Sequence, residues 1–580
     1  MRRIRAAHVL TVGVLALATA AAATSSGAAA GGRPGTEEAR KPAGVASLAT
    51  HVTADDLRFE HHLLRTGSPS QAHLLAEPVT RMSADLRAFL EPSPSRPMYA
   101  GGVVLASRHG VVAVHDAAGH ALRYADADTE LPAEQQVDMQ RDTIFDLASV
   151  TKTFTTLAVM QQVEAGRVGL DEPVATYLPA FAEHGKDDVT VRQLLTHTGG
   201  LPAWLPLYRA YPTIEERLAA VLAVEPRTEP GAAYVYSDLG LITLGLLVEE
   251  VTGQPLDAVI ADGITGPLGM TDTMFNPPAS LVDRIAATEA QPWAGREMIR
   301  GEVHDENAWS LGGVAGHAGL FSTAHDLALL ARTLLNGGRY GETRILDEDT
   351  VRAMLVNENS EFPSNAHGLG FELDQRWYMD GLSSPVTFGH TGYTGTSVVI
   401  DPLSDSFVVL LTNRVHPTRT WGSNNPARRA VARDLARAIA VRPLEGPTAW
   451  FSGVGDSRTV TLSTASLSGR QLSFGLWFDT EAGYDVLSLE TSTDGGETWA
   501  PLPFTLGEET TDGTLSGFGD RRWHSAAALL PVADDVLVRW RYANDAANQG
   551  RGVYVDRVRV DGRPLDEGLL TADGWQRSEN

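Results

Sequence analysis

A serine and a lysine three residues apart have the residue types and spacing of a nucleophile and its base. Ser149 and Lys152 stand in the stretch "FDLASVTKTF", at the start of a segment whose spacing predicts an amphipathic helix. Residues i and i+3 share a helix face, and the dipole at a helix N-terminus favours the charge of a serine alkoxide. The chain has 47 basic residues but only three lysines. A lysine kept here indicates a need for an amine that can lose its proton, which arginine cannot do.

Other nucleophilic and cofactor chemistries lack their motifs. The chain contains no cysteine, no Gly-x-Ser-x-Gly elbow, no His-Glu-x-x-His zinc helix and no phosphate loop ending in Lys-Ser or Lys-Thr. We therefore expect neither a metal nor a cofactor. A serine hydrolase that uses a Ser–Lys pair is the remaining nucleophilic option, and a chance Ser-x-x-Lys match is its alternative.

Two further stretches contain residues that could act together with Ser149 and Lys152. "YVYSDLG" places Tyr236 and Asp238 just before an apolar helix, where a phenol and a carboxylate can serve a lysine. By itself, a Ser-Asp pair there is an ordinary helix cap. "FGHTGYTG" places His390, Thr391 and Gly392 at the start of a strand, where the glycine lets a substrate backbone approach. Strand amides there can stabilise an oxyanion, although alone this is only a glycine-rich strand start.

In this order, the motifs Ser-x-x-Lys, Tyr-Ser-Asp and His-Thr-Gly resemble those of the serine β-lactamase and penicillin-binding protein family. The similarity is to its class C-like branch, with D-alanyl-D-alanine carboxypeptidases and esterases, and "LLTHTGGLP" and "GVAGHAGLFSTAHDL" add to it. The resemblance implies an α+β, β-lactamase/transpeptidase-like fold. An antiparallel sheet flanked by helices would meet a helical subdomain, with the site between them.

The resemblance also implies catalytic roles. Ser149 would attack a carbonyl and form an acyl-enzyme, which water then hydrolyses. Lys152 and Tyr236 would share the work of the general base. The backbone amides of Ser149 and Tyr393 would form the oxyanion hole.

Substrate binding is expected from the second and third motifs, where the chain departs from the family pattern. Asp238 replaces the usual asparagine and would hold Lys152, raising the pKa of the amine and shifting the base role to Tyr236. His390, followed by Thr391 and Gly392, replaces a lysine that many members carry. Its contact with an anionic substrate group should therefore weaken above a pH of about 6.5. Both departures argue against efficient β-lactam hydrolysis.

The stretch "GEVHDENAWSLGGVAGHAGLFS" is similar to a subgroup that includes secreted amidases, which cut N-acetylmuramic acid from L-alanine in muropeptides. The alternative is that His304 and His317 simply form hydrogen bonds within a buried loop. The expected function is a secreted serine hydrolase acting on cell-wall peptides or related amides and esters. Whether it is a carboxypeptidase, an amidase or an esterase stays open, and a wall-fragment binder without turnover is the alternative outside enzymes.

The elements that must position these residues can be placed by pattern. Residues 80–442 should form the hydrolase domain, with a hairpin around His109, a capped helix from Ser322 or Thr323 to Gly337, and two strands joined by residues 402–405. The first and last strands should share one sheet. Residues 31–79 are expected as a disordered linker and leading helices that begin near residue 53.

The sequence pattern changes after the hydrolase domain. Residues 447–565 alternate with period two and resemble the jelly-roll modules of secreted bacterial hydrolases, so we expect a β-sandwich, followed by a tail at 566–580. Trp499, Trp523 or Tyr554 could stack on cell-surface glycans, although aromatic strand residues more often form core. Asp556 is a candidate calcium ligand or a plain surface carboxylate.

The net charge and the N-terminal sequence limit the partners that we expect. The net charge of −25 argues against nucleic acid, whose phosphates would be repelled. Residues 1–30 have an arginine-rich start, a short apolar run and small residues, which is typical of a signal peptide. We expect an extracellular protein whose mature chain has no membrane span and whose substrate is a small molecule or a peptidoglycan fragment.

Overall fold

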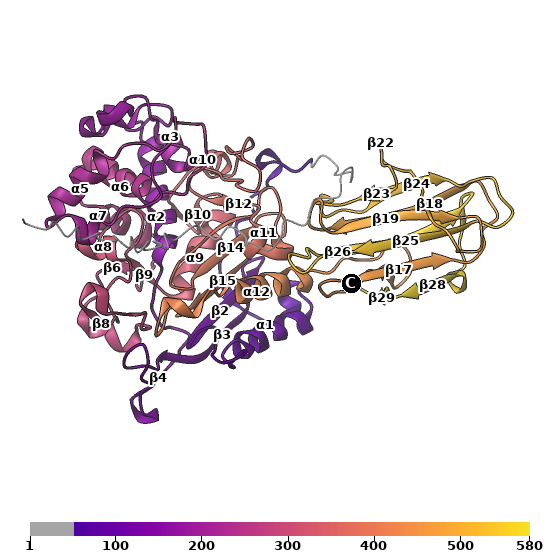
Figure 1. Cartoon of the computed structure of the whole chain (residues 1–580), viewed down its shortest axis with the longest axis horizontal. Helices are drawn as coiled ribbons and strands as arrows, with labels where there is room; N and C mark the ends of the chain where they lie inside the picture. The colour runs from indigo at the N-terminus through magenta and orange to yellow at the C-terminus, as the bar shows by residue number, and fades with distance from the viewer. Residues whose placement is uncertain (1–50) are drawn as a thin grey trace, which may run out of the picture.

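The computed structural model describes residues 51–580. The expected signal peptide lies outside the described residues. Figure 1 shows two parts side by side, a mixed α/β part and an all-β part that extends from it.

The first part is built on a large sheet that joins both ends of the hydrolase segment. In spatial order its strands are β1 (Arg65–Thr66), β3 (Val111–Leu122), β2 (Gly101–Arg108), β15 (Ser406–Thr412), β14 (Ser397–Asp401), β13 (Phe388–Thr391) and β12 (Glu372–Leu373), with β4 (Val137–Asp138) paired to β3. All pairs are antiparallel except β1 with β3. The expected hairpin at His109 and the pairing of early with late strands are confirmed.

Both faces of this sheet are buried. Val103 and Leu105 of β2 belong to one hydrophobic core, whereas Val104 and Ala106 belong to the other. This alternation follows from the two-residue period of a strand. Helix α9 (Ala324–Leu335) packs on the first face, and α1 (Ala76–Ala88) and α12 (Asn425–Ala438) pack on the second.

The remaining helices form the helical subdomain and its connections. They are α2 (Thr151–Glu164), α3 (Val191–Leu195), α4 (Leu207–Ala210), α5 (Ile214–Leu222), α6 (Asp238–Thr252), α7 (Leu256–Ile260), α8 (Glu306–Ser310), α10 (Glu348–Met354) and α11 (Arg376–Met379). Small sheets join β5 (Phe145–Asp146), β9 (Leu320–Ser322) and β6 (Met274–Phe275), then β7 (Ala290–Gln291) and β8 (Arg296–Met298), and β10 (Arg339–Tyr340) and β11 (Thr343–Arg344). As expected, Thr323 caps α9.

Two local predictions are wrong. The helix expected after residue 53 is only a short 3₁₀ turn, Ala54–Asp56, because the following segment runs extended and pairs with β3 through Arg65 and Thr66. The strand expected before residue 402 is a hairpin of β13 and β14. The chain turns back because the amide of Gly392 donates to the carbonyl of Thr396 at 2.8 Å and Gly395 adopts a φ of +114°.

The all-β part consists of two sheets that enclose one hydrophobic core. One sheet contains β22 (Glu509–Thr510), β21 (Phe504–Leu506), β24 (His524–Leu529), β18 (Gln471–Asp479), β26 (Gly552–Val560), β16 (Ala449–Phe451), β29 (Gln576–Ser578) and β27 (Arg563–Pro564). The other contains β20 (Ala500–Pro501), β19 (Val486–Ser492), β25 (Leu537–Ala543), β17 (Thr459–Thr464), β28 (Leu570–Asp573) and β23 (Thr514–Leu515). The segment expected as a tail, 566–580, supplies β28 and β29. Its mostly exposed residues lack the apolar alternation by which strands are recognised.

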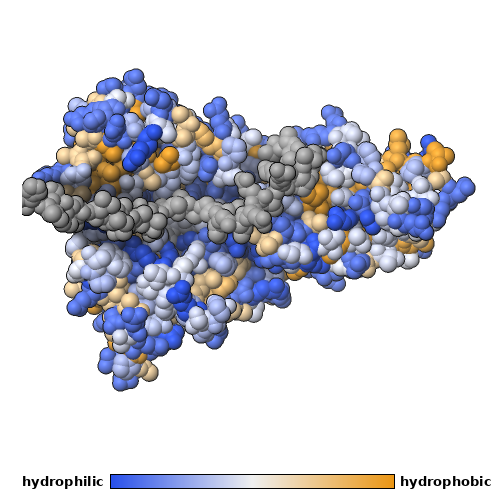
Figure 2. Space-filling view, viewed as in Figure 1, coloured by the Kyte–Doolittle hydropathy of each residue, from blue (hydrophilic) through white to orange (hydrophobic). Residues whose placement is uncertain are grey.

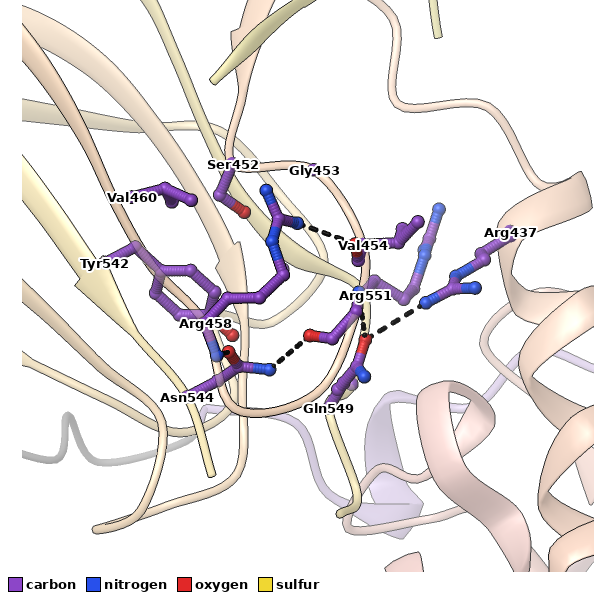
Figure 3. A pocket seen from close by; sticks show the side chains of 13 residues that line it. Arg437, Ser452, Gly453, Val454, Arg458, Val460, Tyr542, Asn544, Gln549 and Arg551 are labelled. Carbon is purple, nitrogen blue, oxygen red and sulfur yellow. Dashed lines mark hydrogen bonds between the residues drawn. The ribbon is translucent and has the colours of Figure 1, made fainter. Parts of the chain in front are cut away.

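Charged side chains join the two parts. Arg376 of α11 forms an ion pair with Asp479 of β18 at 2.8 Å, and Arg521 of the sandwich pairs with Asp401 of β14. Both carboxylates are fully buried. Figure 3 shows Arg437 of α12 directed toward Gln549 of a sandwich loop, with an Nη2–Oε1 distance of 3.2 Å.

The residues considered for ligands in the sandwich have structural partners. Both backbone amides of the linker residues Leu444 and Glu445 donate to Asp556 Oδ2, at 2.6 and 3.0 Å. Tyr554 is buried and stacks on Phe451, with 4.4 Å between ring centroids. These contacts favour packing over ligand binding at Asp556 and Tyr554.

The described surface is largely polar. In the view of Figure 2, hydrophilic residues cover most of both parts. None of the helices between residues 51 and 580 has the length and apolar character needed to cross a bilayer.

Candidate active site

Ser149 lies in a short 3₁₀ turn, Ala148–Val150, between β5 and α2. Ala148 adopts a φ of +46°, which is unusual for a residue with a side chain. Its amide donates to Asp146 Oδ1 at 2.8 Å, and the Thr394 hydroxyl donates to the Asp146 carbonyl at 2.7 Å. These bonds hold the turn in its strained conformation, so the serine is fixed before a substrate arrives.

Lys152 lies one turn later, with its side chain 2% exposed. Its Nζ donates to Ser149 Oγ at 2.9 Å and to the carbonyl of His317 at 3.1 Å, and it pairs with Asp238 at 2.8 Å. The helix expected here forms, but it is not amphipathic in its burial. Residues 151–160 of α2 are all buried, because the helix packs against α6 and α7 at the centre of the hydrolase part.

The second motif reaches the same amine from the start of α6. Ser237 caps the helix, so its neighbours Tyr236 and Asp238 are held in fixed directions. The phenol of Tyr236 is within hydrogen-bonding reach of Ser149 and Lys152. Nζ of Lys152 also lies 4.9 Å from the Tyr236 ring centroid.

His197 supports Tyr236 and was not assigned a role by the sequence. Its Nδ1 accepts a hydrogen bond from the amide of Ser237 at 3.1 Å, and its ring centroid lies 4.6 Å from that of Tyr236. Burial holds the pKa of His197 well below its ordinary value, which keeps the imidazole neutral and able to accept. The only signal in the sequence is the stretch "LLTHTGGLP" itself.

Charge within the cluster follows from burial and pairing. Burial alone would lower the pKa of Lys152, but the carboxylate of Asp238 and the phenol of Tyr236 outweigh it and raise that pKa. Burial raises the pKa of Tyr236 to about 12, although the nearby Lys152 opposes the shift. At neutral pH the resting site therefore contains a lysine cation, paired with Asp238, and a neutral phenol.

The third motif lies at the end of β13, rather than at the start of a strand as expected. A Cβ on Gly392 would come within 2.1 Å of Thr396 Oγ1 and 2.3 Å of the carbonyl of Leu147. Glycine is thus required for the strand end to approach the turn that carries Ser149. The next residue, Tyr393, is 37% exposed beside this contact.

The expected titration of His390 is wrong. The residue is buried, and burial, followed by the charge of Lys152, lowers the pKa of His390 to about 3. Its Nδ1 contacts the carbonyl of Thr391 at 2.8 Å. A neutral imidazole here gives no charge attraction to an anionic group at any pH near 6.5.

His304 and His317 both have partners in buried loops, as the simpler alternative foresaw. The Nε2 of His304 lies 2.8 Å from Glu289 Oε2, and its amide donates to Asp146 Oδ2 at 2.6 Å. The Nε2 of His317 lies 3.0 Å from Asp305 Oδ1. His304 thus supports the loop before Ser149, while the backbone of His317 contacts Lys152.

An aromatic platform lies next to the third motif. The guanidinium of Arg419 lies 5.0 Å from the Trp293 ring centroid and 5.6 Å from that of Tyr393. Glu306 Oε1 accepts from both the Trp293 indole, at 3.1 Å, and Arg419, at 2.8 Å, and Glu289 binds Arg419 at 2.7 Å. Trp293 is nevertheless 51% exposed. Its ring is fixed in orientation and open to a ligand, a feature that no motif indicated.

Two groups of possible metal ligands occur among residues 51–580, and neither includes Ser149, Lys152, Tyr236, Asp238 or His390. One joins Glu60, His62, His109 and Asp405, and the other joins Glu481, Asp485 and Asp545.

Comparison with known proteins identifies a family and several relatives of the chain. The family profile described as Beta-lactamase matches residues 86–433. An Escherichia coli K12 protein described as "Putative D-alanyl-D-alanine carboxypeptidase" is 36% identical over 331 residues, covering 52% of this chain and 75% of that protein. A protein of the same description from Salmonella newport is 32% identical over 404 residues, covering 64% and 91%.

Solved structures align with a similar share of this chain. "EstCE1, a hydrolase with promiscuous acyltransferase activity" aligns with a TM-score of 0.49 and 26% identity over 63% of this chain and 99% of that one. A penicillin-binding protein homologue from Caulobacter crescentus aligns with a TM-score of 0.49 and 21% identity, over 62% and 97%.

The chain therefore belongs to the Beta-lactamase family. It has the family's β-lactamase/transpeptidase-like fold, with further all-β sheets in its C-terminal region. It is a serine hydrolase of this family.

Proposed function

We propose that the protein hydrolyses an amide bond of cell-wall muropeptides through an acyl-enzyme on Ser149. The observation that carries this proposal is the buried Lys152 Nζ, which contacts both Ser149 Oγ and the Asp238 carboxylate. A pure binding groove has no need of a lysine pairing of this kind.

In the proposed first step, Ser149 Oγ attacks the carbonyl carbon and its proton passes to Tyr236. Because the resting phenol is protonated, Tyr236 must first lose its proton to solvent before it can accept the proton of Ser149. The cation of Lys152 stabilises the resulting phenolate. The amides of Ser149 and Tyr393 receive the oxyanion. Tyr236 then protonates the leaving amine as the C–N bond breaks, and a water molecule hydrolyses the ester by the reverse proton path.

The substrate class is supported by the names of the relatives and by the N-terminal sequence. The relatives from Escherichia coli and Salmonella carry the description "Putative D-alanyl-D-alanine carboxypeptidase". The signal-peptide pattern of residues 1–30 adds the expectation of export. We include both in the proposal, together with glycan contact through the sandwich.

The geometry favours the bond between muramic acid and L-alanine over a terminal D-alanine. A carboxypeptidase needs a cation for the substrate's terminal carboxylate, and His390 is neutral. The arginines that contact this strand are already engaged. Arg428 donates to the carbonyls of Gly392 and Thr396, Arg414 donates to that of Tyr393, and Arg419 pairs with Glu289 and Glu306.

The aromatic platform supports the same choice. Trp293 and Tyr393 present exposed rings beside the proposed oxyanion amide. Such rings can cover an apolar sugar face while their polar edges stay hydrogen-bonded. In the proposed substrate the scissile carbonyl belongs to the lactyl arm of muramic acid, so we expect the sugar ring that carries this arm to lie against the platform.

Mass spectrometry of purified muropeptides, including pentapeptide forms, tests the proposal with wild type and Ser149→Ala. We expect wild type to separate muramic acid from the peptide, and Ser149→Ala to lose this activity by at least about 10³-fold. Release of D-alanine instead would make the enzyme a carboxypeptidase. If wild type leaves every muropeptide intact but cleaves short-chain esters, the wall substrate is wrong.

Trp293→Ala tests the platform. Loss of the stacked ring should raise KM for muropeptides by about 2- to 10-fold, with little change for a small ester that lacks the sugar. Trp204→Ala is the matched control, since Trp204 is also an exposed tryptophan and lies outside the Arg419 cluster. An equal loss on both substrates would remove the sugar from the proposal.

A further inference from the structure

Two histidines and two carboxylates meet beside the hairpin of β2 and β3. They are Glu60, His62, His109 and Asp405, and one nitrogen or oxygen atom of each lies within 4.8 Å of those of the others. The first two precede β1, His109 lies in the β2–β3 hairpin, and Asp405 lies in the turn between β14 and β15. We call this group the hairpin cluster. No motif indicated it, because its members come from three separate segments.

Both imidazoles of the hairpin cluster face the same carboxylate oxygen. Oδ2 of Asp405 lies 3.0 Å from His109 Nδ1 and 3.5 Å from His62 Nε2. The same Nε2 is 3.1 Å from Glu60 Oε2, and the single N–H at this nitrogen can point at only one of the two oxygens. In a tetrahedral zinc site with bonds of about 2.0–2.2 Å, neighbouring donor atoms are about 3.3–3.6 Å apart. Small side-chain movements would therefore bring these donors to the spacing of a zinc site.

Contacts outside the hairpin cluster fix its members, as is usual for metal ligands. Asn336, which follows α9, accepts a hydrogen bond from the amide of His62 at 3.1 Å and donates to its carbonyl at 2.9 Å. A Cβ on Gly110 would come within 2.8 Å of His62 Cβ, so glycine is required where the hairpin packs against this segment. Arg332 of α9 is fully buried and donates to Asp405 Oδ1, which leaves Oδ2 to the histidines.

The ionisation of Asp405 and the exposure of the cluster both suit a metal ion. Burial would raise the pKa of Asp405, but the contacts with His109 and Arg332 outweigh it and lower that pKa. Metal binding requires a deprotonated carboxylate of this kind. The side chains of His62 and His109 are 35% and 32% exposed. An ion can therefore reach the cluster from solvent.

We propose that Glu60, His62, His109 and Asp405 bind one Zn²⁺ ion. Imidazole nitrogen and carboxylate oxygen are both ligands of four-coordinate zinc, whereas Ca²⁺ and Mg²⁺ prefer oxygen ligands alone. Four protein ligands would leave no open position, which is typical of a structural zinc site rather than a catalytic one. The inference does not depend on the reaction at Ser149.

Such an ion would hold the segment that leads into the hydrolase part. This segment pairs with the large sheet only briefly, through Arg65 and Thr66 of β1. Zinc would join it to the β2–β3 hairpin and to the β14–β15 turn. We therefore expect zinc to reduce local opening of the segment. Arg58, which is exposed, provides a trypsin site there.

Calorimetric titration of ZnCl₂ into the untagged full chain, first treated with chelator and dialysed, tests the site. We expect one Zn²⁺ per chain, a rise in Tm of about 2–5 °C with excess zinc, and slower trypsin cleavage after Arg58. His62→Ala and His109→Ala should each weaken zinc binding by at least about 10-fold and remove the Tm response. Both side chains are partly exposed, so both variants should fold without zinc.

His61→Ala is the matched control, because His61 is an exposed histidine next to the hairpin cluster. It should bind zinc as wild type does. The proposal is overturned if wild type binds no zinc or if His62→Ala and His109→Ala both keep the wild-type affinity. An equal loss of affinity in His61→Ala would also overturn it, since scattered surface histidines would then explain the binding.

Discussion

Two buried clusters of charge, one in each part of the molecule, differ in how their carboxylates are balanced. At the catalytic cluster, Asp238 lies 2.8 Å from Lys152. In the sandwich, Asp485 faces Glu481 and Asp545 where two loops meet, and we call these three residues the loop cluster. In the first case the opposite charge raises the pKa of a base, and in the second the like charges help burial to raise the pKa of an acid.

The difference separates two uses of a buried carboxylate. The Lys152–Asp238 pair contains its own counter-charge, so its net charge is constant through neutral pH. In the loop cluster, burial and the neighbouring carboxylates raise the pKa of Asp485 to about 7, so this carboxyl group titrates near neutral pH. A pH change near neutrality should therefore affect the stability of the sandwich and leave the charge of the catalytic pair unchanged.

Tyr236→Phe should have the largest effect, because it leaves the ion pair intact and removes the proposed proton acceptor. We expect kcat to fall by about 10²- to 10⁴-fold, the usual contribution of a general base. Steady-state kinetics on the cleaved muropeptide measures it. Tyr234→Phe is the control, since Tyr234 is also a partly buried tyrosine whose ring contacts His197. Near wild-type activity in Tyr236→Phe would assign the base role to Lys152 alone.

Asp238→Asn breaks the balanced cluster. Without the carboxylate, the pKa of Lys152 falls, so the amine is deprotonated at lower pH and can accept the Ser149 proton itself. The rise of kcat/KM with pH should therefore begin at lower pH in the variant than in wild type. The pH dependence of kcat/KM for both proteins decides the matter, and superimposable profiles would contradict the assigned role of Asp238.

The loop cluster predicts a smaller effect, on stability. The pKa of Asp485 is about 7 in the folded protein and 3.8 for an ordinary aspartate. Between these values the folded state binds more protons than the unfolded state, so stability should fall as pH rises from about 4 to 7. Asp485→Asn should flatten this slope. Tm measured against pH shows it, and a wild-type slope retained by Asp485→Asn would contradict the assignment.

Local spacing was enough to find the catalytic cluster. Ser149 and Lys152 are one helical turn apart, and lysine is rare in this chain. Residues 101–122 and 406–412 contain short apolar runs at the two ends of the domain with helices between them, and from this order their shared sheet was predicted. These signals depend on neighbouring residues and on residue type, which a sequence displays directly.

Burial and long-range contacts were not predictable in this way. The titration expected for His390 failed because the sequence does not show that its ring is buried. His197 acts through the amide of a residue 40 positions away, and Asp485 meets Asp545 across two loops. The segment 566–580 joins the sandwich through backbone pairing, which its side chains do not reveal.

The ion pairs between the two parts have a consequence for any attempt to divide the chain. Asp401 of the hydrolase part is fully buried against Arg521, and the sandwich carboxylate Asp479 is fully buried against Arg376. A protein truncated after residue 442 would lack Asp479, the carboxylate that pairs with Arg376. It would also expose Asp401, which is buried against Arg521 in the full chain. The two parts are separate by topology, yet each supplies the arginine that pairs with a fully buried carboxylate of the other.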